Sequence, residues 1–213
     1  MNLNRKIGIG VIILILIAIT IIIVAPMLSN SYIYTSPSGE KFEFIRYGSG
    51  GLTTHVLTTY VSYKGDANNY KYALPFRYGP KQLEDISVND NVNANVLNKK
   101  YIYITLNPKY SGKAILATID LAKVLGTADY GVFKIPTEGA LTYLTDNQTN
   151  LTDTTPIITC NQVTKDVGVI MLLIGEKNRA YTNVQGCVII EALDDENLIK
   201  VADRVVYDLL GVM

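Results

Sequence analysis

The sequence predicts an α+β fold: a mixed sheet with a βαβ unit and a C-terminal amphipathic helix, behind an N-terminal transmembrane helix. Three patterns carry this prediction. An apolar run fills residues 7–28, strand-like alternation begins at Lys41, and the end of the chain repeats apolar side chains with helical spacing. Together they divide the chain into a short N-terminus at 1–6, a membrane span, and a folded region beyond it.

The apolar run has the length and composition of a membrane-spanning helix. Its 22 residues, 7–28, would form a helix of ~33 Å, enough to cross a hydrocarbon core of ~30 Å. Arg5 and Lys6 precede the run, and the next charged residue is Glu40. The positive-inside rule therefore predicts a single-pass protein of the cell membrane, with residues 1–6 in the cytoplasm and the main domain outside. A cleaved signal peptide is the alternative, but the run is long for one and no A-x-A-like site follows it.

The next part of the chain predicts a tether and a small antiparallel sheet. Residues 29–40 are polar and contain turn-forming residues, which is typical of a short tether. Residues 41–88 predict a β-meander of roughly three strands, because alternating apolar side chains are combined with Thr-, Val- and Tyr-rich segments. These strands are expected to begin near Lys41, Leu52 and Tyr70.

Residues 89–213 predict a mixed α/β region. An Asn-rich connection at 89–99 leads to a strand at 100–106, a mostly buried helix at 111–125 and a strand at 130–135. A strand, a helix and a strand within about 35 residues favour a parallel pair with a crossover helix.

The last part of the chain is the most regular. The continuously apolar segment 167–174 predicts a strand covered on both faces, with 179–184 as its hairpin partner and 187–192 as a further buried strand. Acidic residues at 194–196 then begin the final helix, where they favour its positive end. Its apolar stripe continues to Leu210 at i, i+3, i+4 spacing, which indicates docking against the sheet.

Two pairs of residues point to an oxidising, extracytoplasmic location. Cys160 and Cys187 are the only cysteines, and an even pair outside the membrane favours a disulfide over two buried thiols. Asn147 and Asn150 begin the two N-x-Thr sequons in the polar loop 145–156, and we expect them to be glycosylated.

Composition excludes several function classes. Two of the 19 basic residues precede the span, so 17 basic and 19 acidic side chains follow it, and no basic field is left to bind nucleic acid. His55 is the single histidine, and no G-x-S-x-G nucleophile motif accompanies it. One histidine and two paired cysteines leave no metal site of the usual zinc ligands, and no motif indicates a cofactor. The sequence thus predicts no catalytic residues, although it leaves the question of an enzyme open.

One polar cluster is a candidate ligand site. The carboxyl end of the 100–106 strand runs into a helix N-terminus, where free N–H groups and the helix dipole favour anions. If the following strand is parallel, its end should lie on the same edge of the sheet. The candidate residues are Asn107, Ser111, Lys113, Thr137 and Glu138. The alternative is that these residues only cap the helix and face solvent.

Three stretches carry a resemblance to a known family. They are KYIYITLNPKYSGKAILATI at 100–119, IPTEGALTY at 135–143, and CVIIEALDDENLIKVADRVVYDLLGVM at 187–213. Together, and behind an N-terminal anchor, they resemble an uncharacterised family of archaeal single-pass membrane-anchored proteins. The resemblance covers most of the chain from Lys41 onward and implies an architecture without an assigned activity. An archaeal source would fit a surface-layer envelope and N-linked glycans.

These observations order the expected functions. First comes a membrane-anchored extracytoplasmic envelope domain that interacts with a protein, a glycan or a surface-layer component without catalysis. Second is an anchored solute- or anion-binding domain that uses the loop and helix start at 107–113. An enzyme of unknown type is third, and it would require a pocket of carboxylates with raised pKa values.

Overall fold

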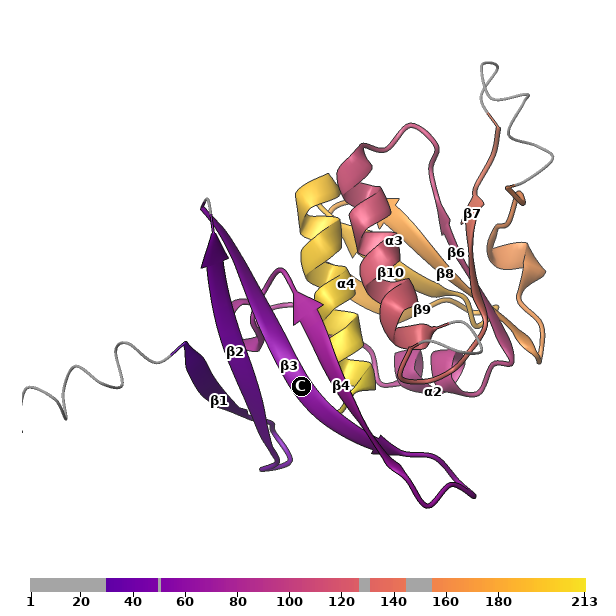
Figure 1. Cartoon of the computed structure of the whole chain (residues 1–213). Helices are drawn as coiled ribbons and strands as arrows, with labels where there is room; N and C mark the ends of the chain where they lie inside the picture. Colours follow the sequence, from indigo (N-terminus) through magenta and orange to yellow (C-terminus); the bar gives the residue numbers. More distant parts are fainter. Residues whose placement is uncertain (1–29, 50, 127–130, 145–154) are drawn as a thin grey trace, which may run out of the picture.

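The computed structural model describes residues 30–49, 51–126, 131–144 and 155–213, and these form two sheets with helices between them (Figure 1). The apolar run at 7–28 and the sequons at Asn147 and Asn150 lie outside the described residues. Among the helices that are described, none is both long enough and apolar enough to cross a membrane.

The first sheet is an antiparallel meander of four strands, one more than the sequence predicts. Its order is β1 (Ser31–Thr35), β2 (Lys41–Ser49), β3 (Leu52–Ser62) and β4 (Asn69–Phe76). The additional strand, β1, occupies part of the segment 29–40 that we expected to be a tether. It pairs with β2 over five residues, because Tyr32 and Tyr34 alternate inward beside the phenylalanines of β2.

One face of the meander is apolar and packs against the last helix, α4 (Asp195–Leu209). Alternation turns Phe44, Leu57 and Phe76 to this face, where they are fully buried. The ring of Tyr207 on α4 meets Phe44 at 5.7 Å and Phe76 at 4.4 Å between centroids. Tyr207 thereby joins the meander to the helical layer.

The second sheet is mixed and has six strands in the order β5-β9-β10-β8-β6-β7. All neighbours are parallel except β9 and β10, which are antiparallel. The strands are β5 (Ser87–Val88), β6 (Tyr101–Leu106), β7 (Thr137–Leu141), β8 (Val167–Ile174), β9 (Arg179–Thr182) and β10 (Val188–Ala192).

The predicted βαβ unit is confirmed, although its second strand lies later in the chain. β6 and β7 are adjacent and parallel, and α3 (Gly112–Leu125) connects them. The strand expected at 130–135 is wrong, because Gly131 has φ +91° and Lys134 has φ +53°. Such left-handed residues turn the chain and cannot continue an extended strand. Pairing therefore begins only at Thr137.

Two further expectations for this region are corrected. The segment β9 is the hairpin partner of β10, and β10 lies between it and β8. The Asn-rich connection at 89–99 contains a short helix, α2 (Asn91–Leu97), because Val92 and Val96 lie one turn apart and are both buried.

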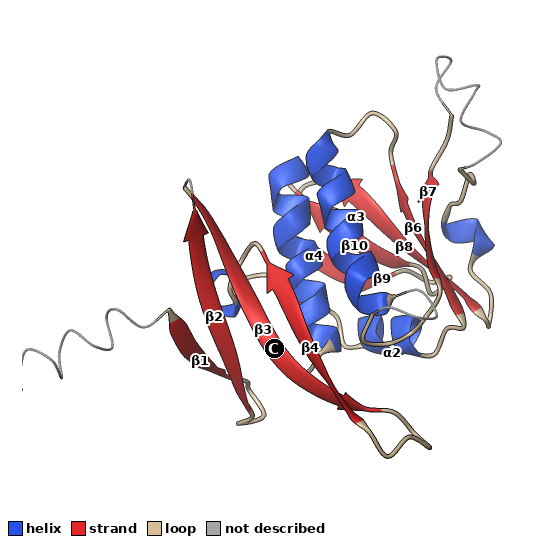
Figure 2. Cartoon of the chain, in the orientation of Figure 1, coloured by secondary structure: helices blue, strands red, loops and turns tan. Residues whose placement is uncertain are grey.

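The helices form the middle layer of the molecule (Figure 2). α3 and α4 lie side by side between the two sheets. Lys113 at the beginning of α3 lies near Glu196 at the beginning of α4, and Lys123 further along α3 lies near Asp203 on α4. The two helices therefore run in the same direction. α4 is amphipathic as predicted and buries its apolar stripe against both sheets. α3 is less buried than expected, since Ile115 and Ile119 are both about half exposed.

A second contact holds the meander to the rest of the fold. It lies at the opposite end of the helical layer from the N-terminus of α4. The hydroxyl of Tyr63, just after β3, donates a hydrogen bond to the carbonyl of Val132 at 2.7 Å. The ammonium of Lys134 lies 3.7 Å from the centre of the Tyr63 ring. Two separate contacts, here and at Tyr207, therefore fix how the sheets are placed.

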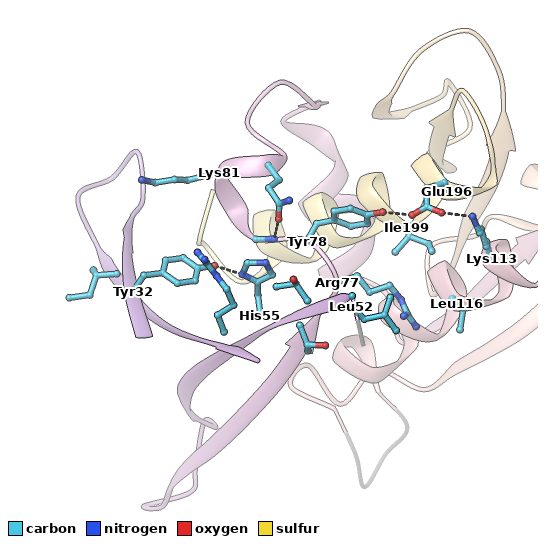
Figure 3. A pocket seen from close by; sticks show the side chains of 17 residues that line it. Tyr32, Leu52, His55, Arg77, Tyr78, Lys81, Lys113, Leu116, Glu196 and Ile199 are labelled. Atoms are coloured by element: carbon cyan, nitrogen blue, oxygen red, sulfur yellow. Dashed lines mark hydrogen bonds and ion pairs between the residues drawn. The ribbon is translucent and has the colours of Figure 1, made fainter. Parts of the chain in front are cut away.

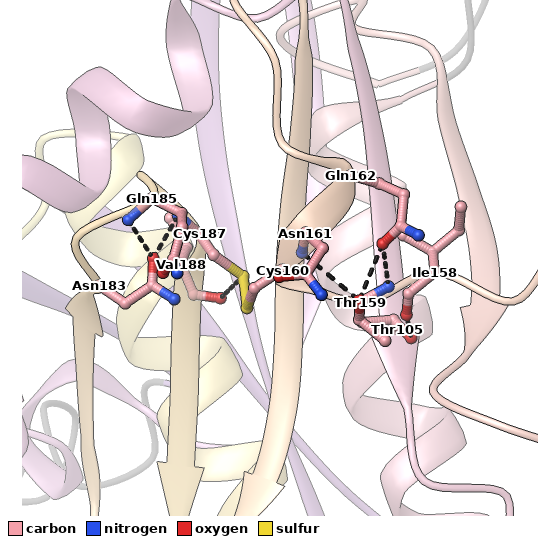
Figure 4. The surroundings of a disulfide bond; sticks show 10 residues. All are labelled: Thr105, Ile158, Thr159, Cys160, Asn161, Gln162, Asn183, Gln185, Cys187 and Val188. Carbon is pink, nitrogen blue, oxygen red and sulfur yellow. Dashed lines mark hydrogen bonds between the residues drawn. A yellow bond between two sulfur atoms is a disulfide. The ribbon is translucent and has the colours of Figure 1, made fainter.

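The predicted disulfide lies on the face of the second sheet that the helices leave uncovered (Figure 4). Cys160 belongs to a short 3₁₀ turn, and Cys187 immediately precedes β10, with the two Cα atoms 5.3 Å apart. A small apolar cluster, which includes Val169 and Ile189, surrounds the bridge. The bond ties the 3₁₀ turn of Cys160 to the beginning of β10, in the middle of the second sheet.

Removing this disulfide should destabilise the fold. The bridge closes a loop with a sequence separation of 27, so the chain-entropy model gives a loss of ~3.5 kcal/mol in the double variant Cys160→Ala/Cys187→Ala. Chemical unfolding of the full chain in detergent micelles, with and without a reductant, measures this loss. The reductant should lower the stability of the wild type but leave the double variant unchanged, and equal sensitivity of the two would contradict the prediction.

Candidate functional site

A groove of about 830 Å³ opens between the meander and the N-terminal ends of α3 and α4 (Figure 3). Residues from β1, β2, β3, the 3₁₀ turn Pro80–Gln82, α3 and α4 line it, so it exists only because the meander packs against the helices. Its volume is in the range of small-molecule sites in proteins. The groove is therefore the candidate functional site within the described part of the chain.

His55 and Tyr32 form a hydrogen-bonded pair at one end of the groove. The Tyr32 hydroxyl lies 2.7 Å from His55 Nδ1. Burial, together with the nearby Arg46 guanidinium, lowers the pKa of His55, so the imidazole is neutral at pH 7. Burial also raises the pKa of Tyr32 to about 12, and the phenol keeps its proton. This end of the groove thus offers neutral hydrogen-bonding groups.

A glycine permits this pair to approach the 3₁₀ turn. A Cβ atom on Gly79 would lie 2.8 Å from both His55 Nδ1 and the Tyr32 hydroxyl. These are distances at which atoms of the ring and the phenol must shift, so any side chain at Gly79 would push the turn away from the meander. The shape of the groove depends on this glycine.

Glu196 links the two helices at the other end of the groove. Its carboxylate accepts hydrogen bonds from the Lys113 ammonium and from the Tyr78 hydroxyl. The contact with Lys113 lowers the pKa of Glu196 most, and the contact with Tyr78 lowers it further. The contact between Lys113 and Glu196 also raises the pKa of Lys113. The carboxylate therefore stays ionised and neutralises one of the basic groups in the groove.

Three further basic side chains line the groove. Arg46 lies over the Tyr32 ring at 5.4 Å, and Lys81 projects from the 3₁₀ turn. Arg77 lies between the two ends, with its Nε 3.7 Å from a carboxylate oxygen of Asp120 on α3. Counting Lys113, four basic residues line the groove and only one acidic residue does. Because the whole chain has no net formal charge, this is a local concentration of positive charge.

A buried carboxylate fixes the chain segment beneath the groove. Asp203 on α4 is fully buried, and its Oδ2 accepts hydrogen bonds at 3.1 Å from the backbone N–H groups of Arg77 and Tyr78. Burial and the neighbouring Asp120 carboxylate raise the pKa of Asp203 to about 7. Its Oδ1 has no hydrogen-bond partner among the described residues, and neither has Oδ2 of Asp120.

The structure separates the five residues that the sequence predicts as a ligand site. Lys113 lines the groove, and Ser111 caps α3 beside it, where its hydroxyl accepts a hydrogen bond from the Lys113 N–H. Asn107 follows β6 and accepts a hydrogen bond from Tyr143.

Thr137 and Glu138 lie elsewhere. They pair with Ile102 and Tyr103 at the beginning of β6, so they are at the amino end of the parallel strands, away from Asn107 at the carboxyl end. The Glu138 carboxylate accepts a hydrogen bond from Tyr101. The shift of β7 to 137–141 explains this separation, since the expected edge was based on a strand that ends at 135.

The groove presents binding groups and no assembled catalytic set. Thr53 and Thr54 also line the groove, and the hydrogen-bond partner of the His55 ring among the described side chains is the phenol of Tyr32. Across the described residues, no group of three or more His, Cys, Asp or Glu side chains could hold a metal ion. The chemistry available is hydrogen bonding and attraction of negative charge.

Sequence reasoning missed most of the groove. Its one weak signal is the segment RYGPK at 77–81, where two basic residues flank a Gly-Pro turn. Comparison with known proteins adds no further assignment: no protein-family model, no curated protein and no solved structure matches this chain.

Proposed function

We propose that this chain is a membrane-anchored extracytoplasmic binding domain, and that its groove binds an anionic ligand that carries carboxylate or phosphate groups. The observation behind this proposal is the excess of basic side chains in the groove, four against one carboxylate. Of the two leading expectations from the sequence, this geometry favours solute or anion binding, at a site that shares only Lys113 with the predicted one.

Two features support the remaining parts of the proposal. The apolar run at 7–28 has the length of a membrane anchor and follows two basic residues. The disulfide between Cys160 and Cys187 is compatible with an oxidising compartment outside the cytoplasm. Resemblance to archaeal anchored proteins agrees with this location, and an anionic group of an envelope glycan would be a ligand of the proposed chemistry.

Reversing one charge in the groove should weaken anion binding. Lys81 lies at the rim of the groove, and Lys81→Glu replaces an attractive contact with a repulsive one. A charge-assisted contact contributes about 1.5–3 kcal/mol, so we expect at least a tenfold rise in the Kd for citrate. Isothermal titration calorimetry of the full chain in detergent micelles, at low salt, measures this change.

A matched variant controls for net charge. Lys64 is an exposed lysine in the turn between β3 and β4, at the far end of the meander, and Lys64→Glu changes the total charge equally. We expect this variant to bind citrate as the wild type does. Equal weakening by both substitutions would assign the effect to overall charge, and absence of citrate and phosphate binding by the wild type would refute the proposed function.

A further inference from the structure

The outer face of the meander is left uncovered by the rest of the described chain. The helices pack on one face of this sheet only, and no described element lies against the other (Figure 1). Alternation turns every second residue of β1 to β4 to this outer face. We call it the outer meander face.

The outer meander face carries an apolar row near the beginning of β1, and the charged residue Glu43 lies beside this row, opposite Ile33. Ile45, Val56 and Pro75 lie opposite one another across three strands, in register with Ser31. Beside this row, Ile33 is 63% exposed and Tyr47 is 55% exposed. Single exposed apolar residues need no explanation, but a contiguous group on one face marks a surface that contacts something apolar.

The short distance along the chain between the proposed anchor and β1 indicates which apolar surface lies closest to the outer meander face. The proposed anchor ends at residue 28, and the Asn30 carbonyl already accepts a hydrogen bond from the N–H of Arg46. Two residues span no more than ~7 Å, so the beginning of β1 cannot be far from the surface of the bilayer. Because β1 replaces the expected tether, the meander has no length of free chain that would let it move away.

We propose that the outer meander face docks on the surface of the membrane that anchors the chain. Ile33, Ile45 and Val56 would contact the boundary between headgroups and acyl chains, and Tyr47 would place its ring at the level of the headgroups. This proposal rests on the membrane anchor of the proposed function and does not depend on the ligand of the groove.

A single introduced tryptophan tests this docking, because the natural chain contains none. Full-length Tyr47→Trp is reconstituted into vesicles of phosphatidylcholine and phosphatidylglycerol, prepared with or without brominated acyl chains. We expect the brominated lipid to quench the introduced indole about twofold, since docking places the ring near the acyl chains. Val184→Trp is the matched control, since Val184 is 99% exposed in the turn between β9 and β10, on the other sheet.

The outcomes separate this proposal from its alternatives. Strong quenching at position 47, little at 184, and loss of quenching on adding Ile45→Asp would support docking. Equal quenching at 47 and 184 would overturn it. An unquenched indole at 47 whose emission shifts to the blue as the protein-to-lipid ratio rises would also overturn it, in favour of a second copy. Citrate binding in the same samples reports separately on the groove.

Discussion

Replacing Asp203 with asparagine should make the protein more stable at pH 8 and leave it nearly unchanged near pH 4. Burial and the Asp120 carboxylate raise the pKa of Asp203 from 3.8 to about 7 in the folded chain. The folded state therefore holds a proton that the unfolded state releases between these pH values, and stability falls as the pH rises through this window. Above pH 7 the full cost is about 4 kcal/mol, which Asp203→Asn removes.

The charged and polar groups around Asp203 determine how its substitution affects stability. Asp120 and Lys123 face it from α3, and Arg77 and Tyr78 face it from the end of β4. The side-chain oxygen of asparagine still accepts hydrogen bonds from the backbone N–H groups of Arg77 and Tyr78. Urea unfolding across pH 4–8 should give a stability difference between variant and wild type that grows with pH.

A second variant separates charge from hydrogen bonding at this position. Asp203→Ala also removes the charge, but it leaves the N–H groups of Arg77 and Tyr78 without their acceptor. It should therefore be less stable than Asp203→Asn at every pH, by about 1–3 kcal/mol for each unpaired buried group. A stability difference for Asp203→Asn that does not change between pH 4 and pH 8 would show that Asp203 is ionised throughout.

Replacing Tyr207 with alanine should destabilise the protein by about 4 kcal/mol, the usual loss for a large buried aromatic side chain. Tyr207 is fully buried, and its ring contacts Phe44 and Phe76 on the meander. Its hydroxyl donates a hydrogen bond to the Tyr78 carbonyl at 2.9 Å. The alanine variant leaves a cavity where the meander meets α4, so the groove should also lose its shape and its affinity for citrate.

The phenylalanine variant is the control for this substitution. Tyr207→Phe keeps the ring and removes only the hydrogen bond to Tyr78, which should cost about 1 kcal/mol. Equilibrium unfolding of both variants gives the two free energies. If alanine cost no more than phenylalanine, the ring would not be what joins the meander to the helices.

Patterns confined to one segment predicted the fold well. The βαβ unit followed from a strand, a helix and a strand in short succession, and α4 followed from seven apolar positions at helical spacing. The disulfide followed from cysteine count and the expected compartment. Errors arose where a local pattern was ambiguous. β1 looked like part of a tether because it is short and lies in a mostly polar segment, 29–40, that contains Pro37 and Gly39. Lys134 gave no sign of its left-handed backbone.

The groove could not be predicted in the same way. Its residues extend from Tyr32 to Ile199 and come together only when the meander packs on α4. That packing includes the contacts of the Tyr207 ring and the close approach at Gly79, and neither has a periodic signature in the sequence. The predicted ligand site relied on the edge of a single sheet, and so it shared only Lys113 with the groove between the meander and the helices.

The position of α4 in the chain has a consequence for biosynthesis. The meander emerges from the ribosome early, but the carboxylate that holds its last strand, Asp203, comes 126 positions after Arg77. Until α4 is made, the apolar inner face of the meander has no helix to cover it. Such distant contacts slow folding and expose a nascent chain to aggregation. A chain that ends before Asp195 would therefore lack both Asp203 and Tyr207, which hold the meander to the helical layer in the complete fold.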